Sequence, residues 1–169
     1  MKKIIFSLLV ISGLVACESK TSKSDSPIPA NAFGYTIDSS DNINTVKKAI
    51  NAGVNSDTAV FLTIYADTAA IYDNMNKQTI HENMNMAKVF KSKGITMRLE
   101  KMIDIWETII FKEGNRPYTD HVNVYFDASF IKGSQTVTTR INAIFAFKDG
   151  KIIREWDTYD SAPLVELFK

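Results

Sequence analysis

The chain has 169 residues, of which 45% are hydrophobic and 11% aromatic, and its formal net charge is +1. This length and composition suit one globular domain with a packed core, and they exclude a disordered chain. A nearly neutral chain has no electrostatic reason to bind nucleic acid, so no nucleic-acid partner is expected.

The N-terminus resembles the export signal of bacterial lipoproteins. Met1-Lys2-Lys3 provides a positive start, residues 4–15 are almost wholly apolar, and Leu14-Val15-Ala16-Cys17 is similar to the box where such signals are cut. The apolar run is shorter than the ~20 residues that cross a bilayer as a helix. The resemblance implies that residues 1–16 are removed and that Cys17, the only cysteine, carries lipid. The expected location is therefore the cell envelope, with the membrane as a partner through the lipid.

The residue after the cysteine bears on which membrane is used. Glu18 is not the aspartate that retains some bacterial lipoproteins at the inner membrane, so the resemblance implies the outer membrane where the host is Gram-negative. Residues 17–34 are predicted to hold the lipidated cysteine and a flexible, serine-rich tether broken by Pro27 and Pro29. The folded domain is expected over residues 35–169.

Helices are predicted in the first half of this domain. Ser40-Asp41 is typical of a helix N-cap and precedes apolar residues at helical spacing, and Asp57-Thr58 suits the start of a second, short helix. A short strand is predicted over residues 69–73. Thr79 and Glu82 have the spacing of a capping box, which predicts a third helix ending near Gly94.

The second half is predicted to form consecutive antiparallel strands. Four segments are rich in Val, Ile, Thr, Phe and Tyr and are separated by turn residues: 95–112, 119–131, 136–147 and 151–159. Helices followed by a long meander indicate an α+β domain whose helices cover one face of the sheet. A two-residue turn at Gly133-Ser134 would place Asp127 opposite Arg140 as a surface pair, with His121, Asn123 and Tyr125 on the same polar face.

The closing segment carries a family resemblance. Residues 145–152 look like the last hairpin of nuclear transport factor 2-like proteins, including SnoaL-like polyketide cyclases, and residues 155–161 look like their last strand. Residues 67–73 are a weaker match to an early region of the family. The resemblance implies a cone-shaped, curved antiparallel sheet wrapped around N-terminal helices, with a cavity between them. It also implies that such domains often form homodimers through the sheet.

The register of the last strand decides which residues face that cavity. A two-residue turn at Asp149-Gly150 places Ile152, Arg154 and Trp156 on the apolar face, whereas a bulge at Gly150 after a longer turn places Ile153, Glu155, Asp157 and Tyr159 there. The family resemblance favours the second register, with Asp157 as the candidate catalytic base. The residues expected to bind a ligand are Tyr65, Tyr72, Trp106, Phe126, Ile141, Phe145, Glu155 and Tyr159.

No cofactor or metal is predicted. The two histidines, His81 and His121, are far apart in the sequence, and no cluster of metal-binding residues or phosphate-binding loop is present. The favoured function is a lipid-anchored, extracytoplasmic domain that binds a small apolar or amphipathic molecule or a protein partner. The alternative is a cofactor-independent isomerase, cyclase or hydrolase that uses Asp157. Binding is favoured over catalysis because the partner groups of the family's known enzymes have no clear match in the sequence.

Overall fold

The computed structural model describes residues 32–111 and 120–169. The predicted signal sequence, Cys17 and most of the tether lie outside the described residues. Within the described part, the helices are α1 (Asp41–Asn55), α2 (Thr58–Ile64), α3 (Ile80–Ser92) and α4 (Ala162–Phe168). The strands are β1 (Gly34–Ile37), β2 (Tyr65–Asp73), β3 (Asn76–Thr79), β4 (Thr96–Ile110), β5 (Asp120–Lys132), β6 (Gln135–Lys148) and β7 (Lys151–Thr158). In this part of the chain, no helix has the length and apolar character needed to cross a membrane.

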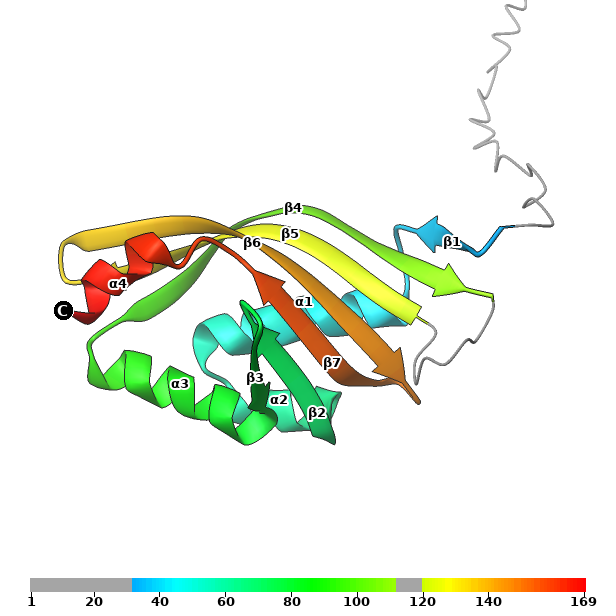
Figure 1. Ribbon diagram of the computed structural model, residues 1–169, viewed down its shortest axis with the longest axis horizontal. Coiled ribbons are helices and arrows are strands. Elements are labelled where there is room, and N and C mark those ends of the chain that lie inside the picture. The colour runs from blue at the N-terminus through cyan, green and yellow to red at the C-terminus, as the bar shows by residue number, and fades with distance from the viewer. Residues whose placement is uncertain (1–31, 112–119) are drawn as a thin grey trace, which may run out of the picture.

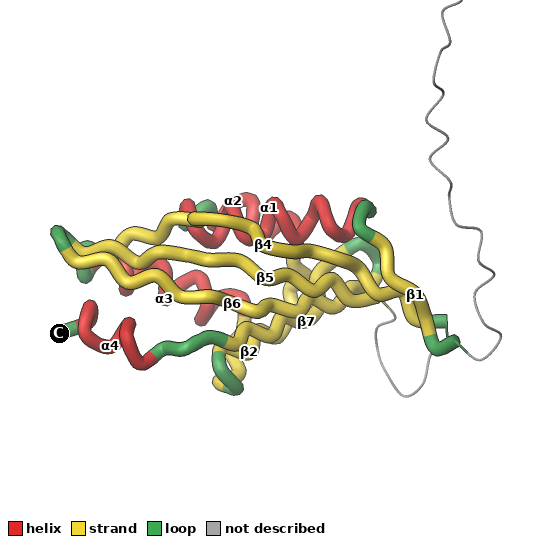
Figure 2. The backbone as a smooth tube through the Cα atoms, turned by 90° about the horizontal axis from the view of Figure 1, so that it is seen from above, coloured by secondary structure: helices red, strands yellow, loops and turns green. Residues whose placement is uncertain are grey.

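All seven strands belong to one curved, open sheet with the order β1-β4-β5-β6-β7-β2-β3. The strand pairs are antiparallel except for β2 and β7, which run parallel. Figure 1 shows α1, α2 and α3 on the concave side of the sheet, and Figure 2 shows β4, β5, β6 and β7 side by side. The predicted α+β class, with a curved and mainly antiparallel sheet packed on helices, is confirmed.

Three predicted helix starts are confirmed at the level of single hydrogen bonds. The Ser40 hydroxyl accepts from the amide of Ile43 at 3.0 Å, and the Asp57 carboxylate accepts from the amide of Val60 at 3.1 Å. Thr79 and Glu82 form the reciprocal capping box. These bonds satisfy amides that the first helical turn leaves without partners, and each is worth about 1 kcal/mol.

Alternation along β5 and β6 separates a core face from a polar face. On β5, Val122, Val124 and Ala128 are fully buried against the helices. On the opposite face, Asp127 lies directly across from Arg140 as predicted, and Arg140 Nε donates to the carboxylate at 3.0 Å. This pair is solvent-exposed, so it contributes at most about 1 kcal/mol.

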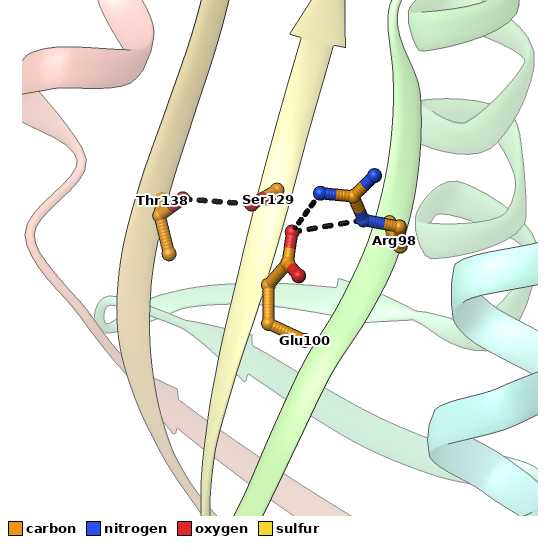
Figure 3. A network of polar contacts seen from close by, with 4 residues as sticks. All are labelled: Arg98, Glu100, Ser129 and Thr138. Carbon is orange, nitrogen blue, oxygen red and sulfur yellow. Dashed lines mark hydrogen bonds and ion pairs between the residues drawn. The ribbon is translucent and has the colours of Figure 1, made fainter.

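A second polar group occupies the outer face where β4, β5 and β6 run together (Figure 3). Arg98 Nε and Nη2 donate to Glu100 Oε1 at 2.9 and 2.6 Å, and the hydroxyls of Ser129 and Thr138 lie 2.7 Å apart. The pairing of β4 with β5 shifts between Leu99 and Lys101, so Glu100 is the extra residue of a bulge. This part of the outer face is therefore polar and bent, whereas the inner face carries the core.

Two strands are not predicted from the sequence. β1 pairs with the far end of β4, and Gly34 is required there because a Cβ would clash with the backbone carbonyl of Ile109. β3 follows a turn in which Asn74 and Met75 have positive φ angles of 44° and 75°. That turn contains no glycine or proline, so the usual sequence signal for a hairpin is missing.

Candidate functional site

The register of β7 combines features of both registers considered from the sequence. Asp149 and Gly150 form a two-residue turn with positive φ angles of 51° and 73°, and Phe147 pairs with Ile152. The next pair joins Ala146 to Arg154, so Ile153 is an extra residue in the ladder. The predicted bulge at Gly150 is therefore wrong, because the bulge lies three residues later. Ile152 faces inward before it, and Glu155 and Asp157 face inward after it.

These inward side chains meet a cavity of about 610 Å³ between the helices and the sheet. Its walls come from α1, α2, α3 and the inner faces of β2 and β4–β7. Apolar side chains form most of the wall, among them Ile50, Phe61, Met84, Phe90, Phe126 and Phe145. Small-molecule sites have this size and this apolar character, with a few polar groups that orient the ligand.

Glu155 is one of these polar groups. Its Oε2 accepts a hydrogen bond of 2.6 Å from the hydroxyl of Tyr65, which lies at the start of β2. Burial raises the pKa of Glu155 to about 7, although the hydrogen bonds from Tyr65 and Asp157 oppose that rise. Glu155 can therefore change its protonation state near neutral pH.

Asp157 lies beside Glu155 and shares a side-chain hydrogen bond with it. Burial, followed by the charges of Glu155 and Asp73, raises the pKa of Asp157 well above its ordinary range. Two like charges at close range in an apolar cavity cannot both form at low cost, so the pair holds a proton. An acid and a base thus stand side by side at neutral pH.

Asp73 is the third carboxyl group of the cavity, and it is not among the residues expected from the sequence. It ends β2, where it pairs directly with Asp157 across the parallel ladder. Burial, followed by a hydrogen bond with Asp73, raises the pKa of the Tyr159 hydroxyl. Alternation along the predicted strand could have found Asp73, because Ala69, Ile71 and Asp73 share one face and the first two are buried.

Seven of the nine residues expected at the site line the cavity: Tyr65, Phe126, Ile141, Phe145, Glu155, Asp157 and Tyr159. The expectation for the other two is wrong. Tyr72 stacks on Trp156 at a ring separation of 6.1 Å, and Trp106 stacks on Tyr125 at 5.9 Å. Along their strands, Tyr72 and Trp106 each stand between residues that face inward. Both therefore lie on the outer face, and neither reaches the cavity.

No group of three His, Cys, Asp or Glu side chains in residues 32–111 and 120–169 is arranged to hold a metal ion. The three carboxyl groups of the cavity are instead arranged to share protons with each other and with two tyrosine hydroxyls. The chemistry available at this site is proton transfer in an apolar environment.

Solved structures share this fold. An NTF2-like protein of unknown function from Burkholderia pseudomallei K96243 superposes with a TM-score of 0.56 at 14% identity, covering 78% of this chain and 99% of its own. A protein assigned as a polyketide cyclase from Xanthomonas campestris pv. campestris superposes with a TM-score of 0.55 at 13% identity, covering 76% of this chain and 97% of its own. A protein assigned as a SnoaL-like polyketide cyclase from Jannaschia sp. CCS1 superposes with a TM-score of 0.53 at 14% identity, covering 76% of this chain and 91% of its own.

The fold is thus the NTF2-like fold that SnoaL-like polyketide cyclases also have. No family model matches the sequence, and no curated protein matches it significantly. At these low identities the likeness concerns the fold alone, so the function must be argued from the cavity.

Proposed function

We propose that the protein binds a small, largely apolar molecule in this cavity and transfers a proton on it, in the manner of a cofactor-independent isomerase or cyclase. The observation that carries the proposal is the pair formed by Glu155 and Asp157 inside an apolar cavity, one titrating near neutral pH and the other retaining its proton. Such a pair offers a base and an acid to the same ligand.

The proposed step begins when the Glu155 carboxylate accepts a proton from a carbon next to the ligand's carbonyl group. Asp157 donates its proton to the carbonyl oxygen, so an enol forms without a free charge in the cavity. Glu155 then gives its proton to another carbon of the ligand, or to the oxygen of a second carbonyl group as a ring closes, while the enol hydroxyl returns its proton to Asp157. Glu155 is then a carboxylate again and Asp157 an acid. The hydrogen bond from Tyr65 fixes the orientation of Glu155 throughout.

A second candidate is ligand binding without turnover. Both tyrosine hydroxyls of the cavity are directed at carboxyl groups, Tyr65 at Glu155 and Tyr159 at Asp73. Neither is then available to polarise a ligand carbonyl unless it first gives up its present partner. The cavity would in that case hold a ligand with no acceleration of chemistry.

We further propose that the domain is anchored in the cell envelope through lipid on Cys17. The support is the sequence Leu14-Val15-Ala16-Cys17 after a short positive and apolar segment. The chain between Cys17 and the first strand at Gly34 would reach roughly 55 Å when fully extended. That reach would let the domain lie away from the membrane surface.

The two candidate functions are separated by proton exchange on a model ketone. The purified protein is incubated with β-tetralone in D2O, and proton NMR follows both the ligand's shift changes on binding and the loss of its α-protons. Catalysed exchange that is lost in Glu155→Gln and kept in Asp67→Asn supports proton transfer, because Asp67 is an exposed carboxylate on the same strand as Tyr65. Binding without catalysed exchange supports the second candidate. Absence of any binding contradicts both.

A further inference from the structure

The charges of the cavity wall are unbalanced. Asp73, Glu155 and Asp157 contribute three carboxyl groups to it. The basic residue among the described lining residues is Lys91, which lies on α3 and is exposed at the rim, as is Asp57. The carboxyl cluster therefore has no cation from the cavity wall beside it, and buried carboxylates normally have one or are protonated.

One oxygen of this cluster also lacks a hydrogen-bond donor. Among the buried side-chain atoms that the structure describes, Asp73 Oδ1 is the one without a partner. Buried polar atoms almost always have a partner, and an exception calls for an explanation. Asp73 also lines the cavity, so a positively charged donor on a bound ligand would pair with its carboxyl group and offset the repulsion that Asp73 exerts on Glu155 and Asp157.

The surroundings of the cluster suit the rest of such a ligand. Phe61 and Tyr65 stack at a ring separation of 4.4 Å, and both line the cavity together with Phe126, Phe145 and Tyr159. The faces of aromatic rings attract an ammonium group, and the same rings pack against the apolar part of a ligand. The wall is thus complementary to a molecule that is cationic at one end and hydrophobic over the rest.

We propose that the natural ligand is a small hydrophobic amine that also carries a carbonyl group, bound as its ammonium ion with the positive group paired to Asp73. This inference rests on the proposed function, because it names the class of ligand for the same cavity. It gives the three carboxyl groups different roles. Asp73 holds the cation, while Glu155 and Asp157 keep the shared proton that the proposed step needs.

The affinity of the carboxyl cluster for the ammonium ligand should depend on pH in one direction. The groups that face the ammonium are Asp73 and Tyr65 from β2 and Glu155, Asp157 and Tyr159 from the β7 end, with Asp57 and Lys91 at the rim. The pKa of Glu155 is about 7, so the cluster becomes more negative as the pH rises through neutrality. A primary amine stays protonated there, since its pKa resembles the ~10.4 of lysine. Amine affinity should therefore increase between pH 6 and 8.

The test uses three probes that share an indole ring and differ in charge: tryptamine, tryptophol and indoleacetate. Isothermal titration calorimetry on the purified protein at pH 7.5 should give an affinity for tryptamine at least tenfold higher than for tryptophol, and weaker binding still for indoleacetate. Asp73→Asn should abolish the preference for tryptamine while tryptophol binding persists. Asp67→Asn, which changes an exposed carboxylate on the same strand, should leave the preference intact.

The outcomes separate this inference from the proposed function. Tryptophol binding as well as or better than tryptamine would overturn the amine proposal and leave a small-molecule cavity in place. The amine proposal is likewise overturned if Asp73→Asn keeps the preference, or if the preference does not grow between pH 6 and 8. If none of the three probes binds and β-tetralone does not bind either, both proposals fail together.

Discussion

The hydroxyl of Tyr65 donates a hydrogen bond of 2.6 Å to Oε2 of Glu155, ninety residues further along the chain. Tyr65 begins β2, and Glu155 follows the bulge on β7. The parallel pairing of these strands brings the two residues together at the cavity, and burial raises the pKa of both side chains. This contact joins the helical half of the chain to its last strand at the point where the proposed chemistry takes place.

Removal of the Tyr65 hydroxyl should make Glu155 harder to ionise. The hydrogen bond from Tyr65 favours the charged carboxylate, so Tyr65→Phe should move the pKa of Glu155 above about 7 and lower the free energy of unfolding by about 1–2 kcal/mol. Carbon-13 NMR titration of the Glu side-chain carboxyls measures the shift. Tyr159→Phe is the matched control because its hydroxyl faces Asp73. An unchanged Glu155 titration in Tyr65→Phe would contradict the structural assignment.

The carboxyl pair should make the folded state less stable as the pH rises. The pKa of Glu155 is about 7 in the folded protein and 4.5 ordinarily, so between these values the unfolded chain binds fewer protons than the folded one. The free energy of unfolding should fall across pH 4.5–7, by about 2 kcal/mol given the half-buried position of Glu155. Urea denaturation measures this slope. Glu155→Gln should flatten it, whereas Asp67→Asn should not.

Asp157→Asn should preserve or raise stability near neutral pH. Its carboxyl group retains a proton in the folded state but ionises on unfolding, so the wild type loses more stability with rising pH than the asparagine variant, in which only the Glu155 contribution remains. The comparison is made by chemical denaturation of both proteins from pH 4 to 8. Equal pH profiles would place Asp157 in water rather than in the cavity.

Two glycines should respond to alanine with opposite signs. Gly150 has a φ of +73° with no atom within 4 Å of an added Cβ, so Gly150→Ala should cost about 1 kcal/mol through backbone strain alone. Gly53 lies inside α1, and an added Cβ would meet Phe61 at 3.8 Å, an ordinary contact. Gly53→Ala should stabilise by about 0.5–1 kcal/mol. Thermal unfolding of the pair measures both effects, and the same sign for both would contradict the backbone assignment.

Local signals predict much of the fold. Ser40, Asp57 and Thr79 are recognisable as helix caps because each can accept from an amide two or three residues ahead, a contact that needs no knowledge of the distant chain. The pairing of Asp127 with Arg140 follows in the same way from the length of one turn. Such features depend on a few neighbouring residues, so the sequence alone predicts them.

The features that the sequence does not predict depend on the packing of distant elements. A bulge at Ile153 has no local signature, since the register on either side of it is set by pairing and packing with distant elements. The expected place of Trp106 in the cavity is wrong although each of the two register shifts in β4 exchanges the faces of the strand, because the two shifts cancel and leave Trp106 on the outer face. The turn at Asn74-Met75 places two non-glycine residues at positive φ, which the surrounding sheet must impose.

Lipidation of Cys17 is tested by mass and by location. Intact-mass analysis of protein extracted from membranes should show a species that lacks residues 1–16 and carries acyl chains on Cys17. Cys17→Ser should yield a soluble or unprocessed form, while Ser19→Ala, two residues away, should not change the outcome. Retention of Met1 or an unmodified Cys17 in the wild type would contradict the prediction.

Dimerisation through the outer face of the sheet is a further expectation. Tyr125 is 38% exposed there and stacks on Trp106, so it offers an aromatic anchor for a second copy. Sedimentation at micromolar concentration should show a dimer, and Tyr125→Arg should give a monomer. Val165→Arg, on α4, should leave the dimer intact. A monomeric wild type would exclude this mode of assembly.

The bulge at Ile153 decides the chemistry of the cavity, because it sets which side chains of the last strand face inward. If the same residues formed a regular ladder without the bulge, Arg154 and Trp156 would face the ligand and both acids would turn toward solvent. An acidic cavity and a basic, aromatic one therefore differ by one bulge on this scaffold. When related chains are compared, the presence of a bulge between the turn and the acids will say more about ligand charge than the identity of the acids themselves.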